Sequence, residues 1–161
     1  MTTEQTQQTE PDLSYDESVI GVEVDAGDVE ITREQITRYC EAIGETNPLY
    51  LDERAAAEGP YGGIIAPPGL LHTIQTQGWM DPKVKFGNTT FAAGSRAELL
   101  HPVHAGDTIN ARVAIKEVYA KTGRTGTMMF VVRRTTYRNQ DGVDVAINDF
   151  STVHRQVEKI G

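Results

Sequence analysis

The sequence has a single cysteine, Cys40, among its 161 residues. One cysteine excludes a disulfide within the chain and a metal site built from several thiolates. The sequence also lacks an apolar run that approaches the roughly 20 residues needed to cross a bilayer. Its N-terminal stretch, MTTEQTQQTEPDLSYDES, lacks the basic start and apolar segment of a secretory signal. We therefore expect a cytoplasmic protein that does not bind membranes.

Basic residues are also fewer than acidic residues. The chain carries 15 Lys and Arg against 23 Asp and Glu, which gives a net charge of −8 at pH 7. Nonspecific nucleic-acid binding requires basic residues that neutralise phosphates, so this balance argues against a nucleic-acid partner. A local basic patch could still bind an anionic ligand, because the net charge does not say where the charges lie.

The overall composition, with 39% hydrophobic and 24% charged residues, is that of an ordinary folded domain. Residues 1–17 are the exception, since their Thr, Gln, Glu and Asp side chains leave little to bury, and we expect a flexible tail there. Residues 18–161 have the length of one domain, which is long enough to build its own core.

Short helices are predicted in the N-terminal half. Thr32 and Gln35 have the spacing of a capping box, and apolar residues at helical spacing follow as far as Gly44. The sequence therefore predicts a helix over this stretch. A short strand is expected before it, at 20–24, and one or two helical turns after it, at 53–58.

A mostly buried helix is predicted from about Gly69 to Trp79, because two prolines precede it and suit a first helical turn. Alternating apolar residues after it predict strands around 109–116, 128–133 and 143–147 and again near Val153, with turns at Gly-Asp, Lys-Thr-Gly-Arg and Asn-Gln-Asp-Gly. We therefore predict an α+β fold in which a buried helix precedes four long antiparallel strands.

Four sequence blocks in this order resemble the MaoC-like dehydratases, which are hot-dog proteins of the hydratase 2 type. Residues 42–52, AIGETNPLYLD, resemble the family's Gly-Asp-x-Asn-Pro-x-His-x-Asp. Residues 63–71, GIIAPPGLL, resemble its Ile-Ala-His-Gly block, and residues 101–108, HPVHAGDT, its Pro-Val-x-x-Gly-Asp turn. Residues 136–142, TYRNQDG, resemble its last hairpin. The resemblance covers about 20–156, which is most of the chain.

The resemblance implies a hot-dog fold, in which a curved antiparallel sheet wraps around a central helix and dimerisation makes a continuous sheet. It implies an acyl-CoA or acyl-carrier substrate, with coenzyme A as part of the substrate and no prosthetic group. The family's active members add water reversibly across a 2-enoyl thioester. An Asp and a His act as acid and base, and a backbone N–H at the start of the central helix polarises the thioester carbonyl.

The chain departs from this pattern at the residues that carry the chemistry. Glu45 stands at the position of the family Asp, and Tyr50 at that of the His. Tyrosine is a poor base at neutral pH, because its ordinary pKa is about 10. Pro67 and Pro68 replace His-Gly, and proline has no backbone N–H. If the alignment slips by one residue, Gly69 takes the place of the donor instead. These replacements resemble the FAS1-like, N-terminal-type branch, whose members pair with a second, catalytic hot dog.

The candidate site therefore has two interpretations. Glu45 and Tyr50 either form an acid–base pair or, as we favour, are a degenerate catalytic site that shapes the pocket. The candidate substrate-binding residues are Asn47, Pro68, Gly69, His72 and Trp79. For Asn47 the structural alternative is that it fixes its loop, as Asp52 would. For His72 and Trp79 the alternative is ordinary core packing.

Lys121 and Arg124, in a glycine-containing turn, are candidates for binding the phosphates of coenzyme A, with simple solvation as the equal alternative. No metal site is expected, because the histidines show no ligand spacing. Three functions follow. The first is the non-catalytic half of a hydratase for a bulky lipid or steroid side-chain thioester, paired with a catalytic MaoC-like subunit in a heterodimer or heterotetramer. The others are a homodimeric hydratase that uses Glu45, and a non-catalytic acyl-thioester binding module.

Overall fold

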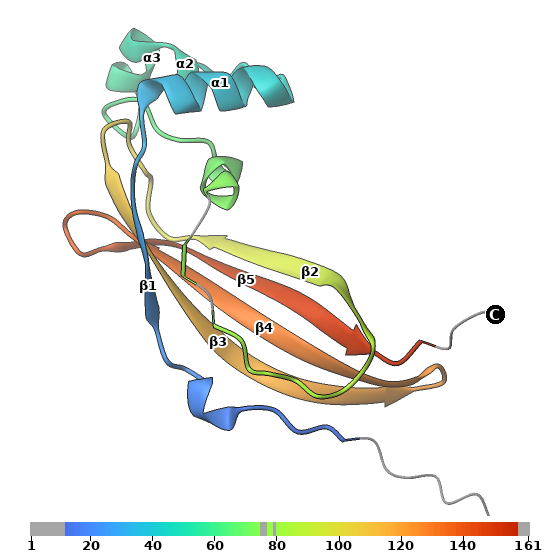
Figure 1. Ribbon diagram of the computed structural model, residues 1–161. Coiled ribbons are helices and arrows are strands. Elements are labelled where there is room, and N and C mark those ends of the chain that lie inside the picture. The colour runs from blue at the N-terminus through green and yellow to red at the C-terminus, as the bar shows by residue number, and fades with distance from the viewer. Residues whose placement is uncertain (1–11, 75–76, 79, 158–161) are drawn as a thin grey trace, which may run out of the picture.

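The computed structural model of the protein describes residues 12–74, 77–78 and 80–157. Its strands form one curved antiparallel sheet in the order β1-β3-β4-β5-β2, and the helices gather at one end of it (Figure 1). The elements are the 3-10 helices η1 (Glu17–Val19) and η2 (Pro68–Thr73), the α-helices α1 (Arg33–Ile43), α2 (Pro48–Leu51) and α3 (Glu53–Glu58), and the strands β1 (Val24–Glu30), β2 (Thr89–Leu99), β3 (Thr108–Gly123), β4 (Gly126–Arg138) and β5 (Asp144–Arg155).

Local capping signals determine α1. The Thr32 side chain accepts a hydrogen bond from the Gln35 N–H, and the Gln35 side chain accepts one from the Thr32 N–H, so the predicted capping box is confirmed. Gly44 ends the helix in the left-handed region, with a φ of 70°, which glycine adopts without strain. Ile36 and Cys40 are the buried residues of α1, and they pack into the core.

The long strands follow the alternation of apolar residues. Ile109, Ala111 and Val113 of β3 are buried, and the residues between them are half-buried. β4 and β5 continue the sheet, and the predicted α+β fold with long antiparallel strands is confirmed. β2 lacks such alternation and is exposed along its whole length at the sheet edge.

The beginning of the chain differs from the prediction. The strand predicted at 20–24 is wrong, because β1 covers Val24–Glu30 instead and Ile20 makes only one bridge, to Ile115. Gly21, with a φ of 74°, interrupts an extended course here. At the described end of the predicted tail, the Asp16 N–H donates to the Pro82 carbonyl, and the Lys85 N–H donates to the Ser14 carbonyl.

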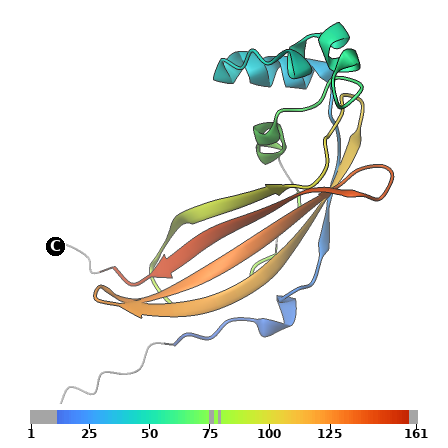
Figure 2. The ribbon, with the colours of Figure 1, turned by 180° about the vertical axis from the view of Figure 1, so that it is seen from behind.

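The predicted long central helix is shortened to η2. Ile74, just beyond it, already has extended backbone angles, and the Thr73 hydroxyl bonds to the Leu70 carbonyl and closes the last turn. The β-branched pair Thr73-Ile74 is also a weak continuation for a helix. η2 lies between the helices and the sheet in both views (Figures 1 and 2), and its Leu70 and Leu71 belong to the core.

Candidate functional site

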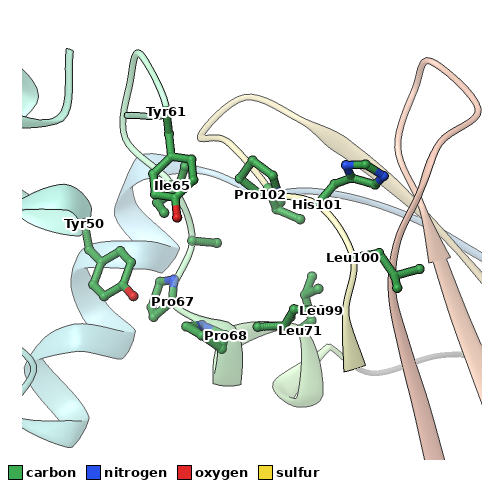
Figure 3. Close-up of a pocket in the computed structure, with 12 residues that line it drawn as sticks. Tyr50, Tyr61, Ile65, Pro67, Pro68, Leu71, Leu99, Leu100, His101 and Pro102 are labelled. Carbon is green, nitrogen blue, oxygen red and sulfur yellow. The ribbon is translucent and has the colours of Figure 1, made fainter. Parts of the chain in front are cut away.

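A pocket of about 370 Å³ lies beside η2, at the end of the sheet where the helices gather. Its walls come from Tyr50 of α2, from Tyr61 and the segment 65–68 that leads into η2 with Leu71, and from residues 99–103, which begin at the last residue of β2 (Figure 3). Most of the lining side chains are aliphatic or proline. The exceptions are Tyr50, Tyr61 and His101. The pocket is therefore suited to an apolar body with few polar groups.

Backbone hydrogen bonds hold the pocket walls together. The Ala66 N–H donates to the Val103 carbonyl over 2.7 Å, and the Ile65 N–H donates to the Leu49 carbonyl over 3.3 Å. These bonds join the segment before η2 to both neighbouring walls. The His104 Nε2 lies 2.9 Å from the Tyr61 carbonyl oxygen and ties that loop to the turn after residue 103.

The Glu45 carboxylate hydrogen-bonds to backbone amides of its own loop. Its Oε1 accepts hydrogen bonds from the Thr46 N–H over 2.8 Å and from the Asn47 N–H over 2.9 Å, and the residue does not line the pocket. Asn47 in turn caps α2, because its Oδ1 accepts from the Leu49 N–H over 3.0 Å. The loop-fixing interpretation of Asn47 is therefore confirmed, and Asn47 also lies outside the pocket lining.

Tyr50 does line the pocket and is half-buried. Its burial raises the pKa of the phenol above its ordinary value, and the nearby Glu45 raises it further. The phenol is therefore protonated at neutral pH and can donate a hydrogen bond, but it is not available as a base. Arg33 fixes the backbone of this turn by donating to the Tyr50 carbonyl over 2.5 Å and to the Leu51 carbonyl.

The N-cap and the first residue of η2 both lack a backbone N–H, and Gly69 is the first residue of η2 that has one. Pro67 is its N-cap and Pro68 its first residue, and both line the pocket. Gly69 does not line it, and its Cα faces the hydroxyl of Tyr39 so closely that an added Cβ would lie 2.0 Å from that oxygen. The predicted substrate contact of Pro68 thus lies at the pocket, and that of Gly69 does not.

The remaining predicted residues lie elsewhere. His72 is exposed and outside the pocket lining, and Trp79 lies outside the described residues. Lys121 and Arg124 are at the β3–β4 hairpin, the opposite end of the sheet (Figure 1). The Lys121 ammonium lies 5.3 Å from the ring centroid of Tyr119, which is a cation–π contact. The structure does not bring this basic pair to the pocket.

Sequence reasoning missed Tyr61 and His101 as pocket residues. Tyr61 stands in a Pro-Tyr-Gly-Gly loop, and the only available signal was an aromatic residue beside the second family block. His101 and the exposed Leu99 and Leu100 follow from the end of β2, whose sequence shows no strand alternation.

Neither a metal centre nor a membrane-spanning helix occurs in the described parts of the chain. Among them, no group of three or more His, Cys, Asp and Glu could hold a metal ion. No helix there is long and apolar enough to cross a bilayer.

Comparisons with known proteins agree with this architecture. The family model for the FAS1-like, dehydratase domain region matches residues 18–148. A UPF0336 protein from Streptomyces avermitilis is 29% identical over 117 residues, which cover 69% of this chain and 78% of that protein. A MaoC-like dehydratase from Rhodospirillum rubrum has a similar structure, with a TM-score of 0.66 and 18% identity, over 86% of this chain and 94% of that chain.

A further relative has a more specific name. The 3-oxo-4,17-pregnadiene-20-carboxyl-CoA hydratase alpha subunit of Mycobacterium tuberculosis is 36% identical over 55 residues. Those residues make up 33% of this chain and 18% of that protein. With the antiparallel sheet order described above, the structural similarity identifies the fold as the hot dog of MaoC-like dehydratases.

Proposed function

Because the chain belongs to the family of FAS1-like dehydratase domain regions, we propose that it is the non-catalytic subunit of an enoyl-thioester hydratase or dehydratase. In this role it accommodates the acyl group, and a catalytic MaoC-like subunit supplies the acid, the base and the carbonyl donor. The family itself is one of hydratases and dehydratases, which sets the class of reaction.

The start of η2 is the observation that carries the proposal. Pro67 and Pro68 offer no N–H to a developing oxyanion, and such a donor is typically worth about 3 kcal/mol of barrier. The residues at the positions of the family's acid and base are also poorly placed for catalysis. Glu45 is turned to its own loop amides, and the neutral phenol of Tyr50 stands where a histidine base would act.

Two features support a bulky acyl group. The pocket is lined mostly by aliphatic and proline side chains, and η2 has only six residues where a longer central helix was predicted. The name of the relative from Mycobacterium tuberculosis, a steroid-type thioester hydratase subunit, is consistent with a lipid or steroid side-chain thioester.

The catalytic partner would bind at the edge strand β2. All eleven residues of β2 are exposed, and in the described part of the chain β2 pairs only with β5. An edge strand with unpaired backbone groups is a template for another strand. A second hot dog added here would make a continuous sheet, in a heterodimer or a heterotetramer. The alpha-subunit name of the same relative is consistent with such a complex.

The deciding experiment compares the chain alone with the chain plus a partner. We expect the purified chain to hydrate crotonyl-CoA no faster than buffer does. Co-expression with a neighbouring gene whose product carries Gly-Asp-x-Asn-Pro-x-His should give a complex that co-purifies and hydrates enoyl-CoA thioesters. Clear turnover by the chain alone, lost in Glu45→Gln, would instead establish the homodimeric enzyme. Tight binding of acyl-CoA with no partner and no turnover would establish the binding module.

A further inference from the structure

Two tyrosines supply the hydroxyls of the pocket. Tyr50 comes from α2 and Tyr61 from the loop after α3, and both side chains lie on the same side of the pocket, near Pro67 (Figure 3). His101 is the remaining residue with a polar side chain in the lining, and its ring points away from the two tyrosines.

Neither hydroxyl is used by the protein. Among the described residues, no hydrogen bond to the phenol oxygen of Tyr50 or Tyr61 is present, and Tyr50 is half-buried whereas Tyr61 is exposed. In the other pocket walls, backbone groups hydrogen-bond to one another, as the Ala66 N–H does to the Val103 carbonyl. Two unused donors in an otherwise aliphatic pocket are the arrangement that orients a ligand by a few polar contacts.

The ligand group must accept hydrogen bonds. Burial and Glu45 raise the pKa of Tyr50, so its phenol keeps its proton at neutral pH. No Lys or Arg lines the pocket, which argues against a carboxylate or phosphate in it. A neutral oxygen with two lone pairs, such as a carbonyl, can accept from two phenols at once.

We propose that the hydroxyls of Tyr50 and Tyr61 together bind a carbonyl oxygen of an acyl ligand whose apolar body fills the pocket. This inference rests on the proposed acyl-thioester function and names the group that the subunit recognises. The two phenols are the hydroxyl donors that this subunit's own pocket offers, and the donor that polarises the carbonyl during hydration stays with the catalytic partner. They hold the carbonyl and do not catalyse hydration, since neither is accompanied by a base in the pocket.

The experiment separates carbonyl recognition from apolar binding. Isothermal titration of the full-length chain uses octanoyl-CoA and S-octyl-CoA, a thioether that differs mainly by lacking the carbonyl oxygen. Two hydrogen bonds of ordinary strength should make the thioester bind roughly tenfold more tightly than the thioether. Tyr50→Phe and Tyr61→Phe should each reduce this ratio, and the double variant should bring it close to one while affinity for the thioether stays unchanged.

A matched control removes a hydroxyl elsewhere. Tyr119 stacks on Phe130 on the sheet, away from the pocket, so Tyr119→Phe should leave the ratio at its original value. Circular dichroism would check that each variant is folded, and the ring is retained in all of them. Equal binding of both ligands by the unmodified chain, or a ratio that survives in the double variant, would overturn the tyrosine inference alone. If neither ligand binds to the chain alone or to its co-purified complex with the catalytic partner, the acyl-thioester function is overturned with it.

Discussion

Asp149 should make the stability of this protein depend on acid in a measurable way. Its carboxylate accepts two hydrogen bonds from Arg134, over 2.7 and 2.8 Å, and one from Lys116, over 2.9 Å. Only 8% of the residue is exposed. The bonds from Arg134 are the largest cause that lowers the pKa of Asp149 from 3.8 to about 2, and burial opposes them in part.

The sign follows from the two protonation states. The folded pKa lies below the unfolded value, so the stabilisation is complete above about pH 5 and is lost as the pH falls toward 2. A shift of nearly two pH units corresponds to about 2.5 kcal/mol at most. The side chains of Lys116 and Arg134 are each 39% exposed, so solvent screens the pair and we expect about 1–2 kcal/mol.

Urea unfolding followed by circular dichroism measures this contribution. At pH 7, Asp149→Asn should lower the free energy of unfolding by about 1–2 kcal/mol, and the difference from the unmodified chain should shrink by pH 2.5. Asp144→Asn is the control. Asp144 bonds to Arg138 over 2.7 Å but is 38% exposed, so its loss should cost under about 0.5 kcal/mol. An Asp149→Asn deficit of equal size at both pH values would refute the electrostatic explanation.

Three further changes test how the site is held. Gly69→Ala should lower the free energy of unfolding by about 1–3 kcal/mol in urea, because its Cβ would lie 2.0 Å from the Tyr39 hydroxyl, and adding Tyr39→Phe should restore part of it. Thr32→Ala should cost about 1 kcal/mol in the same assay by removing the cap of α1, whereas Thr32→Ser should be nearly neutral. Arg33→Met should lower the free energy of unfolding by about 1–3 kcal/mol, because the carbonyls of Tyr50 and Leu51 in α2 lose their donor. The same variant should bind octanoyl-CoA more weakly, because Tyr50 lines the pocket. An unchanged unfolding midpoint for Arg33→Met would contradict that last assignment.

Local signals in the sequence were sufficient for the elements that local chemistry determines. Thr32 and Gln35 predicted the start of α1, Gly44 its end, and residues 53–58 are α3 as expected. β3 was recognised because one face is buried, and burial imposes a period of two. β2 could not be recognised in this way, since both its faces are exposed and nothing selects an alternating pattern.

The short η2 could not be predicted, because the sequence after it looks suitable for a buried helix. Leu70, Leu71 and Ile74 have helical spacing, and Leu70 and Leu71 are buried as expected. Where the helix stops depends on competition between helical hydrogen bonds and tertiary contacts. The Gln77 N–H bonds to the carbonyl of Ala26 in β1, so the chain has already left the helical path there.

Under the proposed function, three positions of the candidate site differ from the family pattern in a common way. Glu45 is a carboxylate like the family Asp, but its hydrogen bonds go to the loop that precedes α2. Tyr50 fills the wall where the family has an imidazole, and Pro68 begins η2 without a donor. At each of these positions the residue present is less suited than its family counterpart to act as a base or as a backbone donor. If the chain is the non-catalytic subunit that we propose, its pocket holds the acyl group while a second subunit performs the reaction, and binding and turnover should then separate between the two chains.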